Sequence, residues 1–414
     1  MHCVIVGASH AAAQLIASLR QQGWTGPITL VGEETLLPYQ RPPLSKAFLS
    51  GELSEEKLFI RPSQAYDKLD VDVKLGVKVQ HINREHKQLQ LSNGEQLSYD
   101  KLALCTGARP RPLPLAGAEL PQVHYLRNAE DSKHIQHQLK AGCRVVIIGG
   151  GYIGLETAAS LHKLGADVTV LEAAERILQR VTAPEVSHFY RHKHQREGVC
   201  IYENTQLECI KGEHKVDAVV TSDGREFPAD MVIVGIGVVP NIELAEAAGL
   251  STDNGIVVDE QGRSSDMDIF AAGDCCAYPH PKLKQMVRLE SVPSANDTAR
   301  IIAATLCNKP APNIEHPWFW SDQYDVKLQI AGVNMAYSEY VLRGQPDEEQ
   351  FSVWYFREGQ LIAADCINRP KDFMAAKQVL KLKIPLTAEQ LANETVELKT
   401  LIEECLEKSR AEAN

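Results

Sequence analysis

The sequence lacks closely spaced cysteines, long apolar runs and an excess of basic residues. No two of its ten cysteines are three or five residues apart, which excludes a CxxC zinc, haem or dithiol site. No apolar run approaches the roughly 20 residues that cross a bilayer. Acidic residues outnumber basic ones by 54 to 43, and the net charge of −11 disfavours nucleic acid as a partner. A strand pattern already begins at His2, so we expect no signal peptide and predict a cytoplasmic protein without a membrane partner.

The remaining composition is that of a folded, globular chain. At roughly 150 residues per domain, 414 residues predict two to three domains. Hydrophobic residues make up 44% and charged residues 23%, which argues against disorder. Scattered cysteines in such a chain are typical of reduced, mostly buried thiols.

Two segments of the sequence follow the same pattern. The first runs from Cys3 to Arg20 and is followed by ITLVGEE; the second runs from Arg144 to Gly165 and is followed by ADVTVLE. Each combines an apolar strand, a glycine-rich turn, a helix of small and apolar residues, and a second strand ending in a carboxylate. Such βαβ units open dinucleotide-binding domains, so the sequence predicts an α/β fold with two Rossmann-like domains.

The second segment carries a complete GxGxxG motif. Gly149 permits the tight turn, Gly151 lets the backbone approach a pyrophosphate, and Gly154 lets the helix pack on the strand. The phosphates then lie at a helix N-terminus, where N–H groups and the helix dipole favour negative charge. Glu172 stands where an acid binds the ribose hydroxyls and repels a 2′-phosphate. The motif therefore predicts NAD(H) rather than NADP(H); a glycine turn in an ordinary α/β sheet is the alternative.

The first segment departs from the motif at one position. Gly7 and Ala12 fit, but Ser9 places a side chain where the backbone should approach phosphate. Glu33, after the following strand, is the expected ribose acceptor, and Glu34 is the alternative. A later apolar strand, DIFAAGD, delivers Asp274 behind Gly273. This arrangement suits hydrogen bonds with a flavin ribityl chain and its phosphate. The alternative is that Asp274 is an ordinary turn residue.

Longer segments then show a family resemblance. YQRPPLSKAFLSGE from Tyr39, YLRNAED from Tyr125, VVIIGGGYIGLE from Val145, DIFAAGD from Asp268 and PWFWSDQYD from Pro317 are similar to FAD-dependent ferredoxin–NAD reductases of oxygenase systems. The likeness extends from about residue 2 to about residue 380. It implies a glutathione-reductase-like layout with two nucleotide-binding domains, in which the first fingerprint holds FAD and the second NADH. A smaller α+β C-terminal domain would close over the flavin.

The resemblance implies roles for matching residues. Lys46 would lie by the flavin ring, Glu156 would pair with Lys46 beside the nicotinamide, and Trp320 would cover the exposed flavin edge. From the residues alone, a solvated helix glutamate is the better explanation of Glu156, and a core aromatic explains Trp320 nearly as well. The implied FAD contacts are Gly7, Ala11, Ala12, Glu33, Arg41, Lys46, Val79, Arg127, Gly273, Asp274 and Val292. The implied NADH contacts are Gly149, Gly151, Ile153, Gly154, Glu172 and Gly237.

The implied reaction is hydride transfer from NADH to FAD, followed by single-electron transfer to a 2Fe–2S ferredoxin of a cytochrome P450 or a ring-hydroxylating dioxygenase. Disulfide reductases share the layout but need cysteines beside the flavin, and residues 37–46 contain no sulfur. A rubredoxin reductase or another cysteine-independent flavoprotein reductase stays open. A redox-sensing protein of the apoptosis-inducing-factor type is disfavoured because the chain is acidic.

The motifs also predict domain boundaries and surfaces. The FAD domain comprises residues 1–108 and 238–312, the NADH domain residues 109–237, and the C-terminal domain residues 313–414. An acidic ferredoxin predicts a local basic patch, for which Arg61 and Arg300 are the candidates and Lys282, Lys284 and Arg288 weaker ones. His188, His192 and His194 lie among charged residues and predict a solvated helix face rather than a metal site. The tail from about Thr387 predicts a surface helix.

Overall fold

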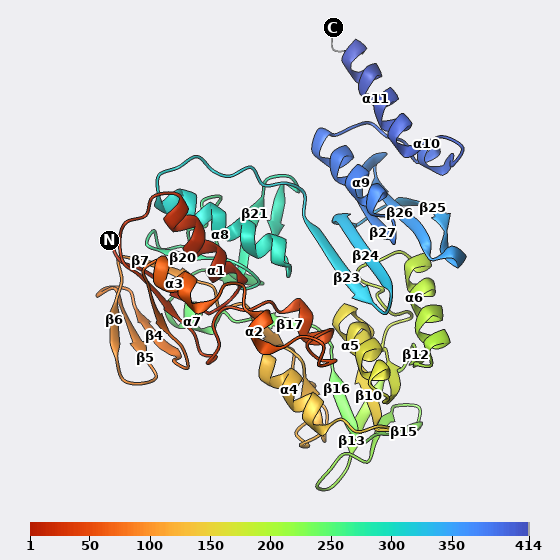
Figure 1. The fold of residues 1–414 in the computed structure, drawn as a ribbon, viewed down its shortest axis with the longest axis horizontal. Coiled ribbons are helices and arrows are strands. Elements are labelled where there is room, and N and C mark those ends of the chain that lie inside the picture. The colour runs from red at the N-terminus through yellow and green to blue at the C-terminus, as the bar shows by residue number, and fades with distance from the viewer. Residues whose placement is uncertain (413–414) are drawn as a thin grey trace. The chain divides into compact units, whose positions relative to one another are not determined.

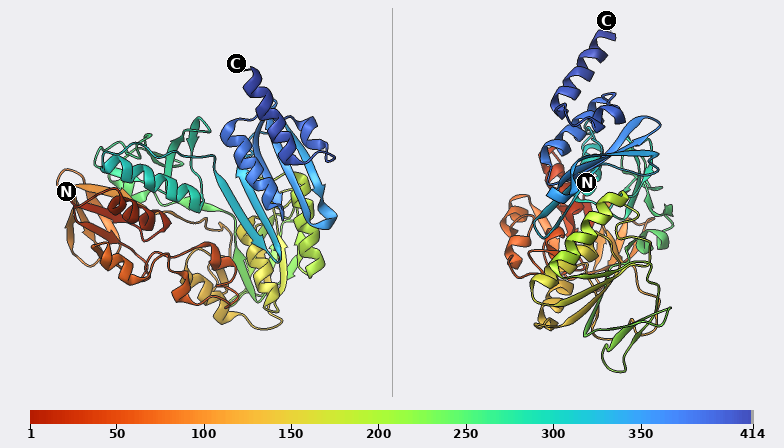
Figure 2. Two further views of the ribbon diagram at one scale, coloured as in Figure 1. Left: turned by 45° about the horizontal axis from the view of Figure 1, so that its top comes forward. Right: turned by 90° about the vertical axis from the view of Figure 1, so that its right-hand side faces the viewer.

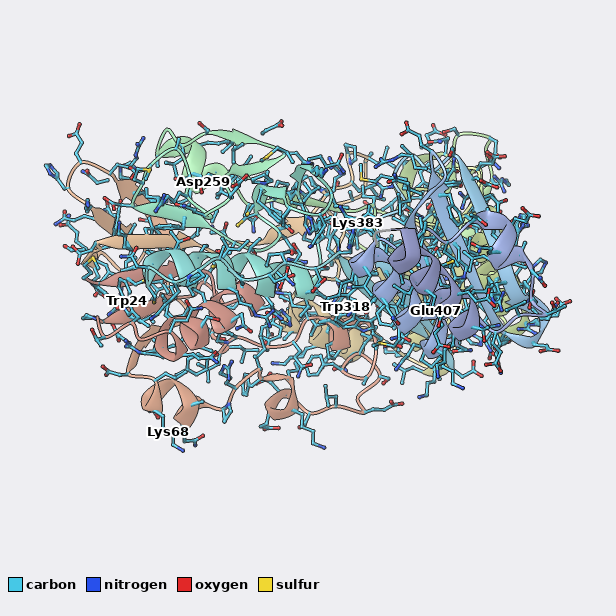
Figure 3. The ribbon with its side chains drawn as sticks, turned by 90° about the horizontal axis from the view of Figure 1, so that it is seen from above. Trp24, Lys68, Asp259, Trp318, Lys383 and Glu407 are labelled. Atoms are coloured by element: carbon cyan, nitrogen blue, oxygen red, sulfur yellow. The ribbon has the colours of Figure 1, made fainter. Side chains whose placement is uncertain are left out.

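The structure is a computed structural model that describes residues 1–412, with the side chains of its last helix as far as residue 407. The chain divides into two compact units. The first comprises Met1–Arg41, Ser54–Arg109 and Val238–Glu315. The second comprises Pro42–Leu53, Pro110–Gly237 and the rest of the chain from His316. Trp24 and Trp318, labelled in Figure 3, belong to the first and second unit respectively. The finer division into three domains stays a prediction.

The first unit is built on a five-stranded parallel sheet of order β20-β7-β1-β2-β3. Its strands are β20 (Ile269–Ala271), β7 (Lys101–Leu104), β1 (Cys3–Val6), β2 (Ile28–Val31) and β3 (Val71–Lys74). Helices α1 (His10–Gln21) and α8 (Val292–Leu306), which are far apart in the sequence, lie side by side (Figure 1). Their small residues share one core cluster with Ile5 and Leu30, while Val6 and Val31 pack into a second cluster, so both strands are buried on both faces.

Smaller elements complete the first unit. The antiparallel sheet β4-β5-β6 turns at Asn93-Gly94, where Gly94 has a φ of 86°, so the predicted hairpin is confirmed. The bounds are β4 (Val79–Asn83), β5 (Gln88–Leu91), β6 (Gln96–Ser98), β18 (Thr252–Asp253), β19 (Gly255–Val257), β21 (Cys276–His280) and β22 (Gln285–Val287). The helices are α2 (Glu55–Leu58), α3 (Ser63–Lys68) and α7 (Glu243–Ala247). Strands β8 (Ala108–Pro110) and β17 (Val238–Pro240) pair where the chain passes between units.

The second unit contains the other parallel sheet, of order β12-β11-β10-β16-β9. Its strands are β12 (Cys200–Tyr202), β11 (Asp167–Leu171), β10 (Arg144–Ile148), β16 (Met231–Val234) and β9 (Val123–Tyr125). The helices are the 3-10 helix η1 (Pro42–Ser45), α4 (Ala129–Gln138), α5 (Tyr152–Lys163) and α6 (Pro184–Glu197). A small antiparallel sheet comprises β13 (Leu207–Lys211), β14 (Ala218–Thr221) and β15 (Glu226–Pro228).

The C-terminal part of the second unit is an antiparallel sheet of order β23-β24-β27-β26-β25, backed by helices. The bounds are β23 (Trp318–Gln323), β24 (Val326–Gly332), β25 (Glu339–Gln345), η2 (Pro346–Glu348), β26 (Gln350–Arg357), β27 (Gln360–Ile367), α9 (Pro370–Leu382), α10 (Ala388–Ala392) and α11 (Leu398–Glu412). Thr387 caps α10, so the helical tail is confirmed as far as it is described; residues 413–414 lie outside. Figure 2 shows β23 running beside α5 of the same unit.

The predicted solvated face of α6 is wrong in part. His188 and His192 are exposed, but His194 is fully buried and Lys193 is 5% exposed. His194 contacts residues of β23 and the turn that follows it, and Lys193 pairs with Asp325 at 2.6 Å. Charged neighbours in the sequence hid this contact because the partners come from the distant C-terminal sheet. Within residues 1–412, no three metal-ligating side chains gather into a possible site.

None of the helices in the described part of the chain combines the length and the apolar composition of a membrane span.

Candidate active site

The second glycine-rich turn has the geometry that a pyrophosphate site requires. It links β10 to α5, and Gly149 has a φ of 108°. A side-chain carbon at Gly149 would lie 2.4 Å from the Gly235 carbonyl oxygen, and one at Gly154 would lie 2.2 Å from the Gly149 carbonyl oxygen. A carbon at Gly151, the N-cap residue of α5, would meet nothing within 4 Å. Gly151 therefore serves no internal packing, and its open side lets an anion approach the helix N-terminus.

Glu172 is held in place at the end of β11 by backbone donors. The Gly150 N–H donates to Oε2 at 2.7 Å, and the Ala174 N–H donates to Oε1 at 2.8 Å. A side-chain carbon at Gly150 would lie 2.6 Å from Cγ2 of Ile177, so glycine is required there as well. The GxGxxG motif does not predict glycine at position 150, because it allows any residue there. Each carboxylate oxygen keeps lone-pair capacity for a ribose hydroxyl.

Two further predicted NADH contacts lie near this turn in the second unit. Ile153, in the first turn of α5, is 45% exposed, which is unusual for isoleucine. Gly237 follows β16 with a φ of 96°, and its carbonyl accepts a hydrogen bond from the Arg111 N–H at 2.9 Å. Their contact with a nucleotide stays a prediction.

The first glycine-rich turn accommodates its serine without blocking the helix. Gly7 has a φ of 106°, and a side-chain carbon there would lie 2.3 Å from the Cys105 carbonyl oxygen. Ser9 is the N-cap residue of α1, and its hydroxyl turns back to accept from the Ala12 N–H at 3.4 Å. Ser9 therefore caps the helix, as serine commonly does.

The acid that follows the first turn stands one residue later than in the second unit. Gly7 and Gly149 each donate to the last residue of the neighbouring strand, so Gly32 matches Glu172 in register. A side-chain carbon at Gly32 would lie 2.8 Å from Cβ of Ala8, whereas glycine occupies the position matching Ala8 in the second turn. Because Ala8 fills the space, the carboxylate moves to Glu33.

The neighbouring acid is already engaged. Glu34 accepts from the Arg41 guanidinium at 2.6 Å and from the Tyr39 hydroxyl at 2.5 Å. Although burial opposes the charge, Tyr39 and Glu34 raise the pKa of Arg41. The Glu33 side chain is 67% exposed and pairs with Lys78 at 3.2 Å. Of the two candidates for the ribose acid, Glu33 is the accessible one.

Other predicted FAD contacts gather at the carboxyl end of β20. Gly273 and Asp274 follow this strand, and the Gly273 N–H donates to Oγ1 of Thr298 in α8 at 3.0 Å. A side-chain carbon at Gly273 would lie 3.3 Å from Cβ of Ala11, so the turn packs closely against α1. Helix α8 begins at Val292, as the sequence indicates. Val79, the first residue of β4, is 6% exposed and also belongs to the first unit.

In the second unit, a buried cluster surrounds Glu156. One oxygen, Oε2, lies 2.6 Å from Nζ of Lys46 and accepts from the Ser45 hydroxyl at 2.6 Å. The other, Oε1, accepts from the Ser321 hydroxyl at 2.7 Å. Glu156 is 5% exposed, so the solvated-helix alternative is wrong and the ion pair with Lys46 is present. Burial leaves little water to screen this pair, which makes its geometry strongly preferred.

The alternation of β23 decides which of its side chains reach that cluster. Ser321 lies on the same face as Phe319, whose ring packs on Tyr152 of α5 at 5.1 Å between centroids. Trp320 points to the opposite face, where its ring lies 5.4 Å from that of Trp318. Trp320 therefore does not join the Glu156 cluster. Ser45 and Ser321 stand inside the recognised motifs, but only their tertiary contacts single them out.

The last predicted contact, Arg127, follows β9 immediately before α4. Its backbone N–H donates to Oδ2 of Asp131 at 2.9 Å, and Asn128 forms a capping box with the same aspartate. This fixes the chain at Arg127, while contact of its side chain with a flavin stays a prediction.

The cysteines nearest the first nucleotide turn are poor nucleophiles. Cys105, Cys275 and Cys276 are at most 1% exposed, and burial raises the pKa of each thiol. All ten cysteines are free. Burial and raised pKa therefore make Cys105, Cys275 and Cys276 poor candidates for dithiol chemistry of the disulfide-reductase kind.

Two nucleotide-type turns and a buried Lys–Glu pair define a pyridine-nucleotide-dependent flavoenzyme fold, and the comparisons agree. Residues 1–299 match the Pyridine nucleotide-disulphide oxidoreductase family and residues 318–402 the Reductase C-terminal family, so the chain belongs to this oxidoreductase family. It is 45% identical to putidaredoxin reductase of Pseudomonas putida, over 96% of each chain. It is 43% identical to rhodocoxin reductase of Rhodococcus erythropolis, over 97% of this chain and 94% of that one.

Among solved structures, the chain is similar to the reductase in the covalent putidaredoxin reductase–putidaredoxin complex. That match has a TM-score of 0.95 at 44% identity and covers 98% of both chains. The predicted fold class is confirmed.

Proposed function

We propose that this protein is an FAD-dependent NADH:ferredoxin oxidoreductase. It takes a hydride from NADH onto FAD and passes single electrons to a 2Fe–2S ferredoxin that serves a cytochrome P450 or a ring-hydroxylating dioxygenase. Full-length similarity to putidaredoxin reductase supports this assignment. The observation that carries it is the ion pair between Lys46 and the buried Glu156. Glu156 stands two residues beyond the last glycine of the second fingerprint, and Lys46 ends a segment without sulfur, residues 37–46.

The residues present fit FAD in the first unit. The cradle at Gly7 cannot hold a larger residue, and Ser9 turns away into its own helix cap. Glu33 remains accessible for ribose hydroxyls, and Asp274 follows a buried strand end. We assign FAD contacts to Gly7, Ala11, Ala12, Glu33, Arg41, Val79, Gly273, Asp274 and Val292 of the first unit. Flavin contact by Lys46 and Arg127 stays the prediction that the resemblance implies.

The chain's own residues supply charge and orientation. Bound FAD takes up two electrons together and releases them one at a time. Lys46 provides a cation, and Glu156 holds its ammonium group at 2.6 Å, so the charge is oriented before substrate arrives. Ser45 and Ser321 occupy the remaining sides of the carboxylate and exclude water from it. The N-terminus of α8 at Val292 supplies a second positive potential in the first unit.

NADH binding is assigned to the second fingerprint. Gly149, Gly151 and Gly154 shape the pyrophosphate site, and Glu172 accepts the ribose hydroxyls. Because the charge of Glu172 repels a 2′-phosphate, NADH is preferred over NADPH. NADH is a cytoplasmic reductant, and all ten cysteines are free thiols, which supports a cytoplasmic location.

Stopped-flow reduction by NADH tests the proposal. Flavin absorbance should bleach rapidly on mixing with NADH and return on mixing with an oxidised 2Fe–2S ferredoxin. E156Q keeps the shape of the side chain but leaves Lys46 without its counter-charge, so flavin reduction should slow by about tenfold or more. Return of colour only with a disulfide, or only with rubredoxin, would replace the assigned acceptor. An unreduced flavin would refute the proposal altogether.

We also propose that Arg61 and Arg300 contribute to ferredoxin docking. Arg300 is 48% exposed and lines, with Lys309, an open hollow beside α1 and α8. Arg288, a weaker candidate, is less accessible, because its side chain is 10% exposed and pairs with Glu290 at 2.7 Å. R300E should lower the ferredoxin-dependent rate and its salt dependence, whereas R357E makes the same charge change at another exposed arginine and should not. A salt-independent wild-type rate would contradict this docking.

A further inference from the structure

A continuous chain of side-chain hydrogen bonds leads away from Glu156. Ser321 Oγ donates to Glu156 Oε1 at 2.7 Å, and Gln323 Nε2 donates to Ser321 Oγ at 3.2 Å. His194 Nε2 lies 2.9 Å from Gln323 Oε1, and the Tyr324 hydroxyl lies 3.0 Å from His194 Nδ1. Three residues, His194 of α6 with Gln323 and Ser321 of β23, thus connect the half-buried Tyr324 to the Lys46–Glu156 pair.

The chemistry of each group fixes the direction of every bond in this chain. Ser321 gives its single O–H to the carboxylate, so it must accept from the amide nitrogen of Gln323. Oε1 of Gln323 therefore faces His194, which must donate from Nε2. Burial lowers the pKa of His194 to about 4, so the ring carries one proton and Nδ1 accepts from Tyr324. All four donors point toward Glu156.

Burial makes the direction matter. Ser321 and His194 are fully buried and Gln323 is 1% exposed, so water cannot substitute for a missing donor. Hydrogen bonds aligned head to tail in a low-dielectric interior polarise one another, and the carboxylate at the end receives the strengthened donor. Because side chains alternate along a strand, Ser321 and Gln323 lie on the same face of β23. Their partners on that face are Glu156 of α5 and His194 of α6.

Tyr324 stands at the outer end in an uncommon backbone conformation. Its φ is 55°, in the left-handed region that disfavours residues with a side chain by roughly 1–2 kcal/mol. This conformation sits in the turn between β23 and β24 and brings the hydroxyl onto His194, with ring centroids 5.0 Å apart. A two-residue hairpin of this kind commonly requires a positive φ, so the turn itself fixes the position from which the hydroxyl reaches His194.

We propose that Tyr324, His194 and Gln323 are positioning residues that fix the direction of the Ser321 hydroxyl and thereby orient the Glu156 carboxylate toward Lys46. This inference rests on the proposed function, in which that ion pair assists hydride transfer. The chain orients and does not conduct protons, because relay through Gln323 would require an imidic-acid tautomer of its amide. Its effect is therefore on the geometry of the pair.

The Tyr324 hydroxyl fixes the direction of the hydrogen bonds in this chain. Y324F keeps the ring but removes the donor to Nδ1, so His194 can adopt the other tautomer. The Gln323 amide then rotates to accept from Ser321 with Oε1, and Glu156 loses its donor. One hydroxyl, three residues removed from the carboxylate along the chain of bonds, thus controls its orientation.

The test uses the FAD-loaded protein and four variants: Y324F, S321A, the double variant, and Y340F as the control. Tyr340 also donates its hydroxyl to a carboxylate of the second unit, Glu185, at 2.8 Å, but lies outside the chain of bonds. Nitrogen-15 NMR of labelled histidine, assigned with H194Q, reports the tautomer of His194 directly. We expect protonated Nε2 in the wild type and in Y340F, and a mixture of tautomers in Y324F.

Stopped-flow flavin reduction provides the second readout. S321A should slow reduction by about tenfold, the effect of one charge-assisted hydrogen bond, and Y324F by a smaller factor with the KM for NADH unchanged. Because S321A already severs the chain, the double variant should be no slower than S321A. Multiplying effects, or an unchanged tautomer in Y324F, would overturn the inference. If NADH fails to reduce wild-type flavin, the proposed function fails instead, and the tautomer measurement still decides whether the chain of bonds is directional.

Discussion

Replacing Asp365 by asparagine should stabilise the protein at alkaline pH and leave its stability near pH 4 unchanged. Asp365 lies on β27, is fully buried, and accepts from the Tyr355 hydroxyl at 2.5 Å with Oδ2. Its Oδ1 has no hydrogen-bond partner among the described residues. Burial raises the pKa of Asp365 from 3.8 to about 7, against the opposing effect of the Tyr355 hydrogen bond.

The sign and the magnitude follow from linkage. Between pH 4 and pH 7 the folded protein holds a proton on Asp365 that the unfolded chain has lost, so stability falls as pH rises through this range. A rise in pKa from 3.8 to about 7 corresponds to about 4 kcal/mol at pH values above both. D365N imitates the protonated acid, keeps an oxygen for Tyr355, and escapes this loss.

Thermal unfolding of wild type and D365N between pH 4 and pH 9 measures the effect. The difference in midpoint should be near zero at pH 4, grow through pH 5 to 7, and level off above pH 8. D347N removes an exposed carboxylate from the same sheet region and should show no such growth. A pH-independent difference, or a D365N variant less stable than wild type at pH 8.5, would refute the reasoning.

Three further outcomes are expected. G151A should unfold at the wild-type temperature, because its methyl group meets no protein atom, but it should bind NADH weakly in titration calorimetry, because that methyl group stands where the pyrophosphate approaches. G154A should lower the unfolding temperature, because its methyl group would lie 2.2 Å from a carbonyl oxygen. E172Q should raise the KM for NADH while lowering that for NADPH, since it removes the charge that repels a 2′-phosphate; equal changes for both would contradict this role. His194, with its pKa lowered by burial from 6.5 to about 4, should make wild type lose stability relative to H194Q as pH falls below 6.5. Urea unfolding at pH 7.5 and pH 5 should show a loss of about 2 kcal/mol.

The burial of His194 and Lys193 could not be predicted from the sequence. His194 and Lys193 stand among charged residues on α6, and this pattern predicts a solvated face. Their burial depends on β23 and the turn after it, more than a hundred residues later in the chain. No local pattern encodes such a contact, because helix periodicity reports only how a helix could face a core.

The nucleotide-binding turns, in contrast, were determined by the sequence alone. A turn between a buried strand and a helix favours glycine where φ is positive or another backbone approaches closely. The positions of Gly7, Gly149 and Gly154 in the sequence therefore predict the conformation of the two turns. The same locality predicted the hairpin at Asn93-Gly94 and the start of α8 at Val292.

Only the tertiary structure decided how the acids are used. From its local sequence Glu156 is an ordinary helix glutamate, and only the fold brings it Ser45 and Lys46 from one segment and Ser321 from another. Glu33 is the accessible acid because Ala8 leaves no room for a side chain at position 32. Burial and charge pairing depend on which distant segments fill the surrounding volume. The sequence specifies those neighbours only through the whole fold. For that reason the family resemblance implied the Lys46–Glu156 ion pair, but the residues alone did not indicate it, and the chain of hydrogen bonds behind it was found only in the folded protein.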